Sequence, residues 1–400
     1  MKLAIITTGN FSDMKGVMNY VQEESLRFQA VKQVIKTDTF FIINNYSILL
    51  AFLYKCLGKQ VNRVPYRSGD IYNKDGVNYI LLVRQINLLN ILFTIVFKQF
   101  IPNKVVDVLM VYFKDYDAMI THQLPCHYLA KEIKRKLGIP YITTWHGSDI
   151  NVSPKQSLRI FNVTKNVMEE AAMNYFVSKG LMVASNYITQ KANKDYIYTG
   201  PSSIFRKYSD YEKNKLRQAL NVQDKKVVMF VGNLIPIKNV LVLPLIFSLV
   251  SKKYKEKPIE YWIIGNGVLQ DKLNKELSKL NIDYKMLGKK DPQYLPKYMN
   301  VADILVVPSK NEGFSLVTLE ARTCGCYVVA SNVGGLPESA GEENCFTLDD
   351  NFTSEISNKI VGVLTNDLEP TPLPEEMSWD AAIKKEIVQI NQIIEHKMHM

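Results

Sequence analysis

The sequence predicts an α/β protein built from two doubly wound, Rossmann-like domains. Runs of β-branched and aromatic residues recur along the chain, and each is followed by a turn with Gly or polar residues and then by a helical pattern. This alternation is typical of βα units that form parallel sheets covered on both faces. A length of 400 residues with 47% apolar residues is sufficient for two such cores.

The predicted strands fall into two groups separated by a polar, charged segment at 205–226. The first group spans 3–7, 118–121, 141–145 and 175–178, and the second spans 227–231, 261–264, 284–287, 304–307 and 327–330. After three prolines within 370–374, apolar residues recur at helical spacing from Ile383 to Ile394. We therefore expect domains at 1–206 and 207–375, followed by a C-terminal helix within 376–400.

Cysteine usage and the apolar runs predict a cytoplasmic protein. The five cysteines are scattered, and Cys324 and Cys326 beside Gly325 are better explained as small buried thiols than as a redox or metal site. The apolar run 3–7 is too short for a signal peptide. The runs 39–54 and 85–97 fall below the ~18 apolar residues that a spanning helix needs.

Much of the positive charge lies beside the apolar runs of the first half, and the net charge is +10. The basic residues there are Lys55, Lys59, Arg63, Arg67, Arg84, Lys98 and Lys104. Basic residues beside exposed apolar side chains favour an anionic membrane surface or an acceptor with a phosphate head group. A solvated basic face beside buried helices explains the pattern equally well. No recognised motif accompanies the charge, so nucleic acid is not an expected partner.

The most informative motif, PSKNEGFSLVTLEA at 308–321, follows a predicted strand. Gly313 lets the backbone approach a ligand, and a helix is predicted to begin near Ser315, so backbone N–H groups there suit a diphosphate. Glu320 leans back toward this helix start, where its carboxylate can accept hydrogen bonds from ribose hydroxyls. Glu312 precedes the helix and would lie nearer a transferred sugar. The alternative is that Glu312 is a solvated loop residue and Glu320 an ordinary helix surface charge.

This stretch resembles the donor-binding signature of glycosyltransferase family 4, the retaining GT-B enzymes also called glycosyl transferases group 1. The resemblance extends over nearly the whole second domain, through VGNL at 231–234 with Lys238, IGNG at 264–267, the segment 303–309, VVA at 328–330 and GGLPE at 334–338. It implies two Rossmann-like domains that face each other across a cleft. The second would bind the nucleotide sugar and the first the acceptor, and the last helix would cross back to the first domain.

The resemblance also implies roles for individual residues. The expected catalytic residues are Glu312, His146 and Lys238. The expected donor-binding residues are Gly16, Gly232, Asn233, Gly265, Gly267, Gly313, Phe314, Ser315, Leu316 and Glu320. Lys238 fills the family's lysine position, whereas Asn233 stands where an arginine usually contacts the diphosphate, so one cation is missing. His146 directly follows the strand 141–145 and would contact the donor sugar. No metal and no cofactor are expected.

The predicted activity is transfer of a sugar from a UDP- or GDP-linked donor onto a glycan or lipid-linked acceptor of cell-surface polysaccharide synthesis, such as capsule or O-antigen. The expected location is cytoplasmic, and peripheral on the inner face of the cell membrane if the basic region binds lipid. Alternatives are a nucleotide-sugar epimerase, a PLP-dependent phosphorylase, and a weakly catalytic scaffold subunit of a polysaccharide assembly complex. The DxD pattern at 115–117 precedes a predicted strand, so we interpret it as chance rather than a metal site.

Overall fold

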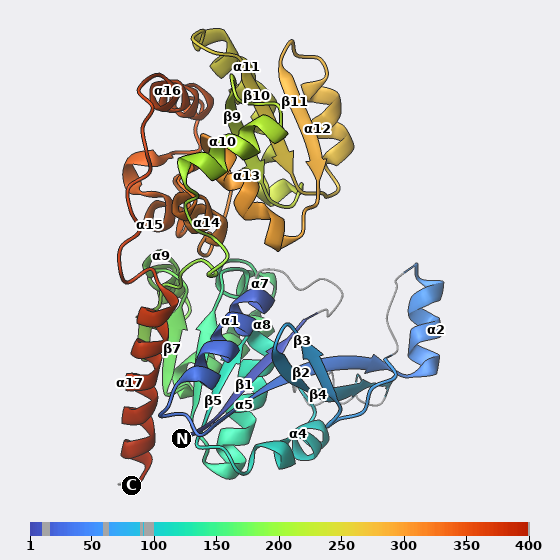
Figure 1. The fold of residues 1–400 in the computed structure, drawn as a ribbon. Helices are drawn as coiled ribbons and strands as arrows, with labels where there is room; N and C mark the ends of the chain where they lie inside the picture. Colours follow the sequence, from blue (N-terminus) through green and yellow to red (C-terminus); the bar gives the residue numbers. More distant parts are fainter. Residues whose placement is uncertain (10–16, 59–63, 89–90, 92–99, 399–400) are drawn as a thin grey trace. The chain divides into compact units, whose positions relative to one another are not determined.

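The computed structural model describes residues 1–9, 17–58, 64–88, 91 and 100–398, which form two compact units (Figure 1). The first unit comprises Met1–Ile197 and Asp380–Met400, and the second comprises Tyr198–Trp379. Each unit has a sheet that is largely or wholly parallel, with helices packed against it. The alternation of strand and helix patterns in the sequence is therefore present in both units.

The first unit has an eight-stranded sheet in the order β3-β4-β2-β1-β5-β6-β7-β8. Its strands are β1 (Lys2–Thr8), β2 (Lys36–Tyr46), β3 (Ile71–Lys74), β4 (Val77–Ile86), β5 (Ala118–His122), β6 (Tyr141–Trp145), β7 (Met173–Phe176) and β8 (Lys194–Tyr196). Neighbouring strands are parallel except β3 and β4. Because β1 lies between β2 and β5, the strand order reverses there, and such a reversal is where open sheets bind ligands.

The helices of the first unit include one from the C-terminal end of the chain. They are α1 (Val17–Ala30), α2 (Ile48–Cys56), α4 (Asn103–Leu109), α5 (Leu124–Leu137), α6 (Ser148–Asn151), α7 (Ser153–Gln156), α8 (Leu158–Glu170), α9 (Lys179–Ala184) and α17 (Trp379–Met398). The Lys385 ammonium of α17 lies 2.8 Å from an Asp195 carboxylate oxygen and donates to the Tyr196 carbonyl oxygen at 2.6 Å. These contacts attach α17 to the strand β8 (Figure 1).

The second unit has a six-stranded parallel sheet in the order β11-β10-β9-β12-β13-β14. Its strands are β9 (Lys226–Val231), β10 (Ile259–Ile264), β11 (Asp283–Gly288), β12 (Ile304–Val307), β13 (Tyr327–Ser331) and β14 (Cys345–Phe346). Its helices are α10 (Asp210–Ala219), α11 (Leu243–Lys253), α12 (Gln270–Leu277), α13 (Leu295–Val301), α14 (Leu316–Thr323), α15 (Leu336–Ala340) and α16 (Phe352–Thr365).

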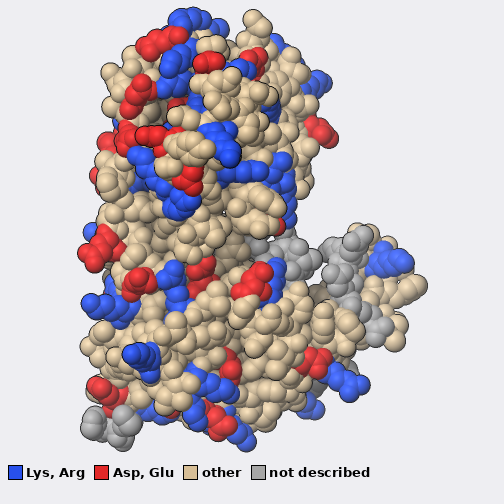
Figure 2. Space-filling view, in the orientation of Figure 1, with Lys and Arg blue, Asp and Glu red and all other residues tan. Residues whose placement is uncertain are grey.

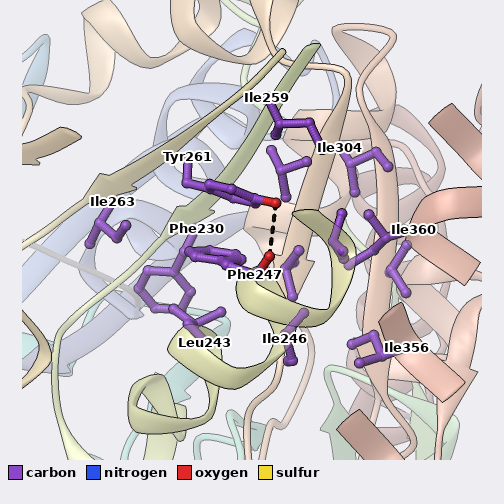
Figure 3. Packing of buried hydrophobic residues seen from close by; sticks show 14 of the residues in the cluster. Phe230, Leu243, Ile246, Phe247, Ile259, Tyr261, Ile263, Ile304, Ile356 and Ile360 are labelled. Atoms are coloured by element: carbon purple, nitrogen blue, oxygen red, sulfur yellow. Dashed lines mark hydrogen bonds between the residues drawn. The ribbon is translucent and has the colours of Figure 1, made fainter. Parts of the chain in front are cut away.

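Alternate side chains of β9 enter two different cores, as the two-residue repeat of a strand requires. Val228 and Phe230 pack with α11 and α16, whereas Val227 and Met229 pack with α13 and α14 on the other face. Figure 3 shows the first of these cores, where the buried Tyr261 hydroxyl donates to the Phe247 carbonyl oxygen at 3.0 Å. Burial on both faces explains why these strands are continuous apolar runs in the sequence.

The structure differs from the sequence prediction at the domain boundary, which falls after Ile197 rather than near residue 206. The segment that follows packs on the second unit: Phe205 is buried in its core, and the Asn300 side chain bonds the Arg206 carbonyl oxygen and the Tyr208 amide. The second boundary likewise lies after Trp379 rather than at 375. The polar composition of the segment 205–226 predicted a boundary, but it did not indicate these contacts with the second unit.

The apolar run at 39–54 belongs to two elements of the structure. Its first part belongs to β2, where Phe40 and Phe41 are buried, and its second part forms α2, whose Leu50 amide is capped by the Ser47 hydroxyl at 3.4 Å. Most of the run 85–97 lies outside the described residues. Within the described part of the chain, no helix is both long and apolar enough to cross a bilayer.

Truncation of Leu243 tests the core shown in Figure 3. Leu243 is fully buried at the start of α11, whereas Leu245 on the same helix is 52% exposed. We expect Leu243→Ala to lower the free energy of unfolding by about 2–5 kcal/mol, because it removes buried methyl groups and leaves a cavity. Urea unfolding followed by circular dichroism measures this. An equal loss in the control Leu245→Ala would contradict the packing described.

Candidate functional site

The strand order of the second unit reverses beside β9, which has β10 on one side and β12 on the other. The loops after β9 and β12 therefore leave adjacent strands at the same edge of the sheet and lead to α11 and α14 on opposite faces. In open parallel sheets, this geometry leaves a crevice beyond the carboxyl ends of the strands. Most of the residues that the sequence assigns to the donor lie on these two loops and on the loop after β10.

Backbone hydrogen bonds hold these three loops together. The Leu234 amide donates to the Asn266 carbonyl oxygen at 2.8 Å, and the Lys310 amide donates to the Ile237 carbonyl oxygen at 2.8 Å. A Cβ on Gly265 would lie 1.8 Å from the Gly232 carbonyl oxygen, and one on Gly267 would lie 2.4 Å from the Leu234 carbonyl oxygen. Gly265 and Gly267, which were predicted to bind the donor, are thus required for contact between the loops.

The structure brings two of the predicted catalytic residues into direct contact. The Lys238 ammonium forms an ion pair with the Glu312 carboxylate, which also accepts a hydrogen bond from the Ser309 hydroxyl at 3.0 Å. The Glu312 side chain is only 13% exposed. Its main-chain carbonyl would lie 1.8 Å from a Cβ on Gly334, where φ is +54°, so that position requires glycine. Glu312 is therefore fixed at both its side chain and its backbone.

The helix α14 begins with unpaired backbone donors. Ser315 is its N-cap residue but makes no side-chain capping bond. Among the described residues, the backbone N–H groups of Phe314, Ser315, Leu316 and Val317 have no hydrogen-bond acceptor. These donors and the positive end of the helix dipole favour an anion at this position.

Glu320 lies one turn into α14 and differs from the other carboxylates of the site. It is partly buried, and burial raises its pKa to about 7. Within the part of the chain that the structure describes, its carboxylate has no hydrogen-bond donor and no cation as partner. A desolvated carboxylate without donors is suited to receive the hydroxyl groups of a ligand.

Two aromatic rings lie beside the start of α14. Phe314 stacks on Tyr198 with ring centroids 5.4 Å apart, and the Tyr198 hydroxyl donates to a Glu338 carboxylate oxygen at 2.5 Å. Neither Tyr198 nor Ser309, whose hydroxyl donates to Glu312, was predicted from the sequence as a site residue. Tyr198 precedes Phe314 by more than a hundred residues, and no motif signalled their contact.

Asn233, which replaces the expected arginine, is exposed in the loop after β9. Its carbonyl oxygen accepts from the Ile235 amide at 3.0 Å. Lys238 is therefore the cation of this loop that pairs with Glu312.

In the first unit, His146 lies directly after β6 and contacts other polar groups. The Asp149 carboxylate accepts from the backbone amides of His146 at 3.1 Å and Gly147 at 2.9 Å, which fixes the turn. Burial raises the pKa of Asp149 to about 6 against these favourable bonds. The Nε2 atom of His146 lies 3.0 Å from Nδ1 of His122, and burial lowers the pKa of His146, so its ring is neutral.

Three further sequence hypotheses have simple outcomes. Gly16 lies outside the described residues, so its proposed contact with a diphosphate stays a prediction. The residues of the DxD pattern precede β5, where the Asp117 carboxylate accepts from the Lys2 amide at 2.7 Å. Cys324 and Cys326 are free, buried thiols. Among the described residues, no three His, Cys, Asp or Glu side chains gather in a way that suits a metal ion.

The chain is similar to solved structures over nearly its whole length. The chain aligns with sucrose-phosphate synthase of Thermosynechococcus elongatus at a TM-score of 0.73 and 18% identity, covering 99% of both chains. It also aligns with Anabaena HepE, solved in complex with UDP and glucose, at a TM-score of 0.66 and 18% identity, over 100% of this chain and 99% of that one. The chain has the GT-B fold.

A known family model matches most of the second unit and the start of α17. Residues 212–384 match the family Glycosyl transferases group 1. An uncharacterized glycosyltransferase of Methanocaldococcus jannaschii is 28% identical over 246 residues, which are 56% of this chain and 59% of that protein. The chain thus spans about three fifths of the length of the first curated relatives that it matches. The segment 212–384 includes all the site residues that the sequence predicted in the second unit, but not Tyr198.

The raised pKa of Glu320 predicts a pH-dependent stability. Above the unfolded pKa of about 4.3, Glu320 is ionised in the unfolded state but remains protonated in the folded state. The folded state therefore loses stability as the pH rises from about 4.3 through about 7. Glu320→Gln removes this cost. We expect the variant to be more stable than the parent at pH 8, on the order of 1 kcal/mol after allowance for partial exposure, and the difference to shrink by pH 5.

Chemical unfolding at both pH values measures this difference. Glu376→Gln, at an exposed carboxylate of the same unit, is the matched control and should show no such trend. Parallel stability curves for Glu320→Gln and the parent protein would contradict the burial of this carboxylate.

Proposed function

We propose that this protein is a retaining glycosyltransferase that uses a nucleoside diphosphate sugar and belongs to glycosyltransferase family 4. Among the described residues, the unpaired N–H groups at the start of α14 lie at the same sheet edge as Lys238, Glu312 and Glu320. The proposal rests on this combination. The group 1 match over 212–384 and the UDP bound in Anabaena HepE support the choice of donor. UDP and GDP are the expected carriers.

Each group has a distinct role in the proposed reaction. The diphosphate accepts hydrogen bonds from the N–H groups of Phe314 to Val317 and takes Lys238 from its ion pair with Glu312. Glu320 accepts hydrogen bonds from the ribose hydroxyls. Glu312, released from the lysine but still held by Ser309, lies near the sugar and stabilises positive charge on its anomeric carbon. His146 of the first unit contacts the sugar.

The proposed reaction breaks one bond, forms one bond and transfers one proton, and it uses no metal or cofactor. The bond between the anomeric carbon and the phosphate oxygen breaks, and its electron pair stays on the nucleoside diphosphate. An acceptor hydroxyl then bonds to the anomeric carbon from the face that the phosphate leaves, and its proton passes to a phosphate oxygen. Attack from the leaving-group face retains the configuration of the sugar. Stabilisation of charge on the leaving phosphate is the main contribution of the protein.

Substitutions at the proposed diphosphate and ribose contacts test the donor site. A thermal-shift screen of UDP-, GDP-, ADP- and CMP-sugars first identifies the donor, and calorimetry then gives its Kd. We expect Lys238→Ala and Glu320→Ala each to raise the Kd about 10-fold or more, because each removes a hydrogen bond to or from a charged group. Lys252→Ala, at an exposed lysine near the other end of α11, is the control and should bind normally. Unchanged Kd values in both site variants would refute the site.

We further propose that the acceptor is lipid-linked and that α2 docks the first unit on an anionic membrane, at the cytoplasmic face. Ile48, Leu49, Phe52 and Leu53 of α2 are all more than 40% exposed. No acidic residue occurs between Asp38 and Asp70, whereas four basic residues do. In Figure 2, α2 shows blue and tan atoms beside the grey ones, and Figure 1 shows it projecting from the sheet. Apolar insertion and basic charge together favour anionic lipid.

Vesicle sedimentation tests this surface. We expect the protein to bind vesicles that contain phosphatidylglycerol better than neutral phosphatidylcholine vesicles, and Leu49→Ser with Phe52→Ser to weaken binding by about 10-fold or more. Leu245→Ser, at a similarly exposed leucine of the second unit, should have no effect. Equal binding by the double variant and the parent protein would contradict membrane docking through α2.

A further inference from the structure

Three polar side chains of the first unit form a continuous row of hydrogen bonds. A Glu24 carboxyl oxygen of α1 lies 2.8 Å from Nε2 of His122, at the end of β5. Nδ1 of the same His122 ring lies 3.0 Å from Nε2 of His146, after β6. Glu24 and His122 are fully buried, whereas His146 is partly exposed. The row thus leads from the protein interior to the one histidine that the proposed function uses.

Only two arrangements of protons satisfy both hydrogen bonds with neutral imidazole rings, because each neutral ring has one N–H. If Glu24 is ionised, His122 donates from Nε2 to Glu24 and accepts at Nδ1 from Nε2–H of His146. If Glu24 is protonated, it donates to Nε2 of His122, which then donates from Nδ1 to Nε2 of His146. The second arrangement puts the His146 proton on Nδ1.

The surroundings favour the second arrangement. The other Glu24 oxygen has no hydrogen-bond partner, and no lysine or arginine of the described residues pairs with Glu24. Glu386 of α17 is also buried, and two ionised carboxylates at these positions would repel each other. Burial raises the pKa of both carboxyls and lowers the pKa of His122 to about 3. All members of the row are therefore uncharged, with Glu24 as the proton donor.

The remaining groups that face the row agree with this assignment. The Tyr20 ring contacts both histidines, with centroids 5.5 Å from His122 and 5.0 Å from His146. Burial raises the pKa of Tyr20 well above its usual value, so its hydroxyl is neutral. His127, on α5, is bonded through Nδ1 to the Thr121 hydroxyl at 2.7 Å, and burial lowers its pKa as well. No cation among these groups offsets an ionised Glu24.

We propose that Glu24 and His122 are positioning residues that fix His146 as the tautomer with hydrogen on Nδ1. The Nδ1 atom of His146 has no hydrogen-bond partner among the described residues, so this N–H is available to a ligand. A donor recognises an oxygen acceptor, which in a nucleotide sugar is a sugar hydroxyl or a phosphate oxygen. The inference rests on the proposed function for the identity of the ligand, but not for the tautomer itself.

NMR of the whole protein with 15N-labelled histidine tests the tautomer without any ligand. We expect the neutral His146 ring to have its hydrogen on Nδ1 at pH 7. Glu24→Gln should keep this state, because its side-chain amide can also donate to Nε2 of His122. Glu24→Leu removes the donor, and we expect the His146 ring to lose the preference for Nδ1–H and the Kd of the nucleotide sugar to rise several-fold. Glu24→Gln, in contrast, should keep both the Nδ1–H tautomer of His146 and the Kd of the parent protein.

Hydrogen on Nε2 of His146 in the parent protein would overturn the proposal, as would the same tautomer in Glu24→Leu. If Glu24→Leu does not fold, the spectra of the parent protein and Glu24→Gln decide the question, because both must show Nδ1–H. Failure of the proposed function would give a different result from failure of the tautomer assignment. A protein with the expected tautomer that binds no nucleotide sugar would refute the donor site and leave the row of hydrogen bonds intact.

Discussion

The parallel pairing of β9 with β12 is the constraint on which the site in the second unit depends. It places the ends of two strands side by side although 76 residues separate Val231 from Val307, and it sends their loops to helices on opposite faces. Lys238 and Glu312 meet because these loops begin at neighbouring positions. The same crossing leaves the start of α14 at the sheet edge, where its N–H groups lack acceptors within the described part of the chain.

The proposed function gives the ion pair of Lys238 with Glu312 a role both without and with the donor. Without a ligand, the two charges neutralise each other, which limits the cost of placing a largely buried carboxylate at the loop. In the proposed reaction, an arriving diphosphate competes for the lysine and thereby frees the carboxylate for the sugar. Asn233 cannot supply a second positive charge. The helix N-terminus and Lys238 therefore provide the positive potential of the proposed diphosphate site.

Features that depend on local pattern were predictable from the sequence. The strands at 227–231 and 304–307, and the helix start near Ser315, follow from apolar runs and turn residues, and the structure confirms them. The strand β2 was missed because the apolar run at 39–54 changes from strand to helix without a break in composition. The positions of Glu312 and Glu320 beside the predicted helix start suggested contacts with a sugar and a ribose, and the family resemblance then made Glu312 an expected catalytic residue.

Contacts between distant segments could not be predicted. Glu24 and His122 are 98 residues apart, and neither belongs to a motif. Glu386 approaches them from a helix that follows the entire second unit. Single histidines and glutamates are common, so only the packing of α1, β5, β6 and α17 distinguishes these from ordinary surface groups. The stacking of Phe314 on Tyr198 was hidden for the same reason.

A crystal structure of the protein with UDP or GDP, whichever binds, is the most direct measurement of the central claim. We expect diphosphate oxygens within hydrogen-bonding distance of the backbone nitrogens of Phe314 to Val317, with the Lys238 ammonium moved from Glu312 to a phosphate. A nucleotide bound elsewhere, or a diphosphate beside α14 with the ion pair of Lys238 and Glu312 unchanged, would contradict it.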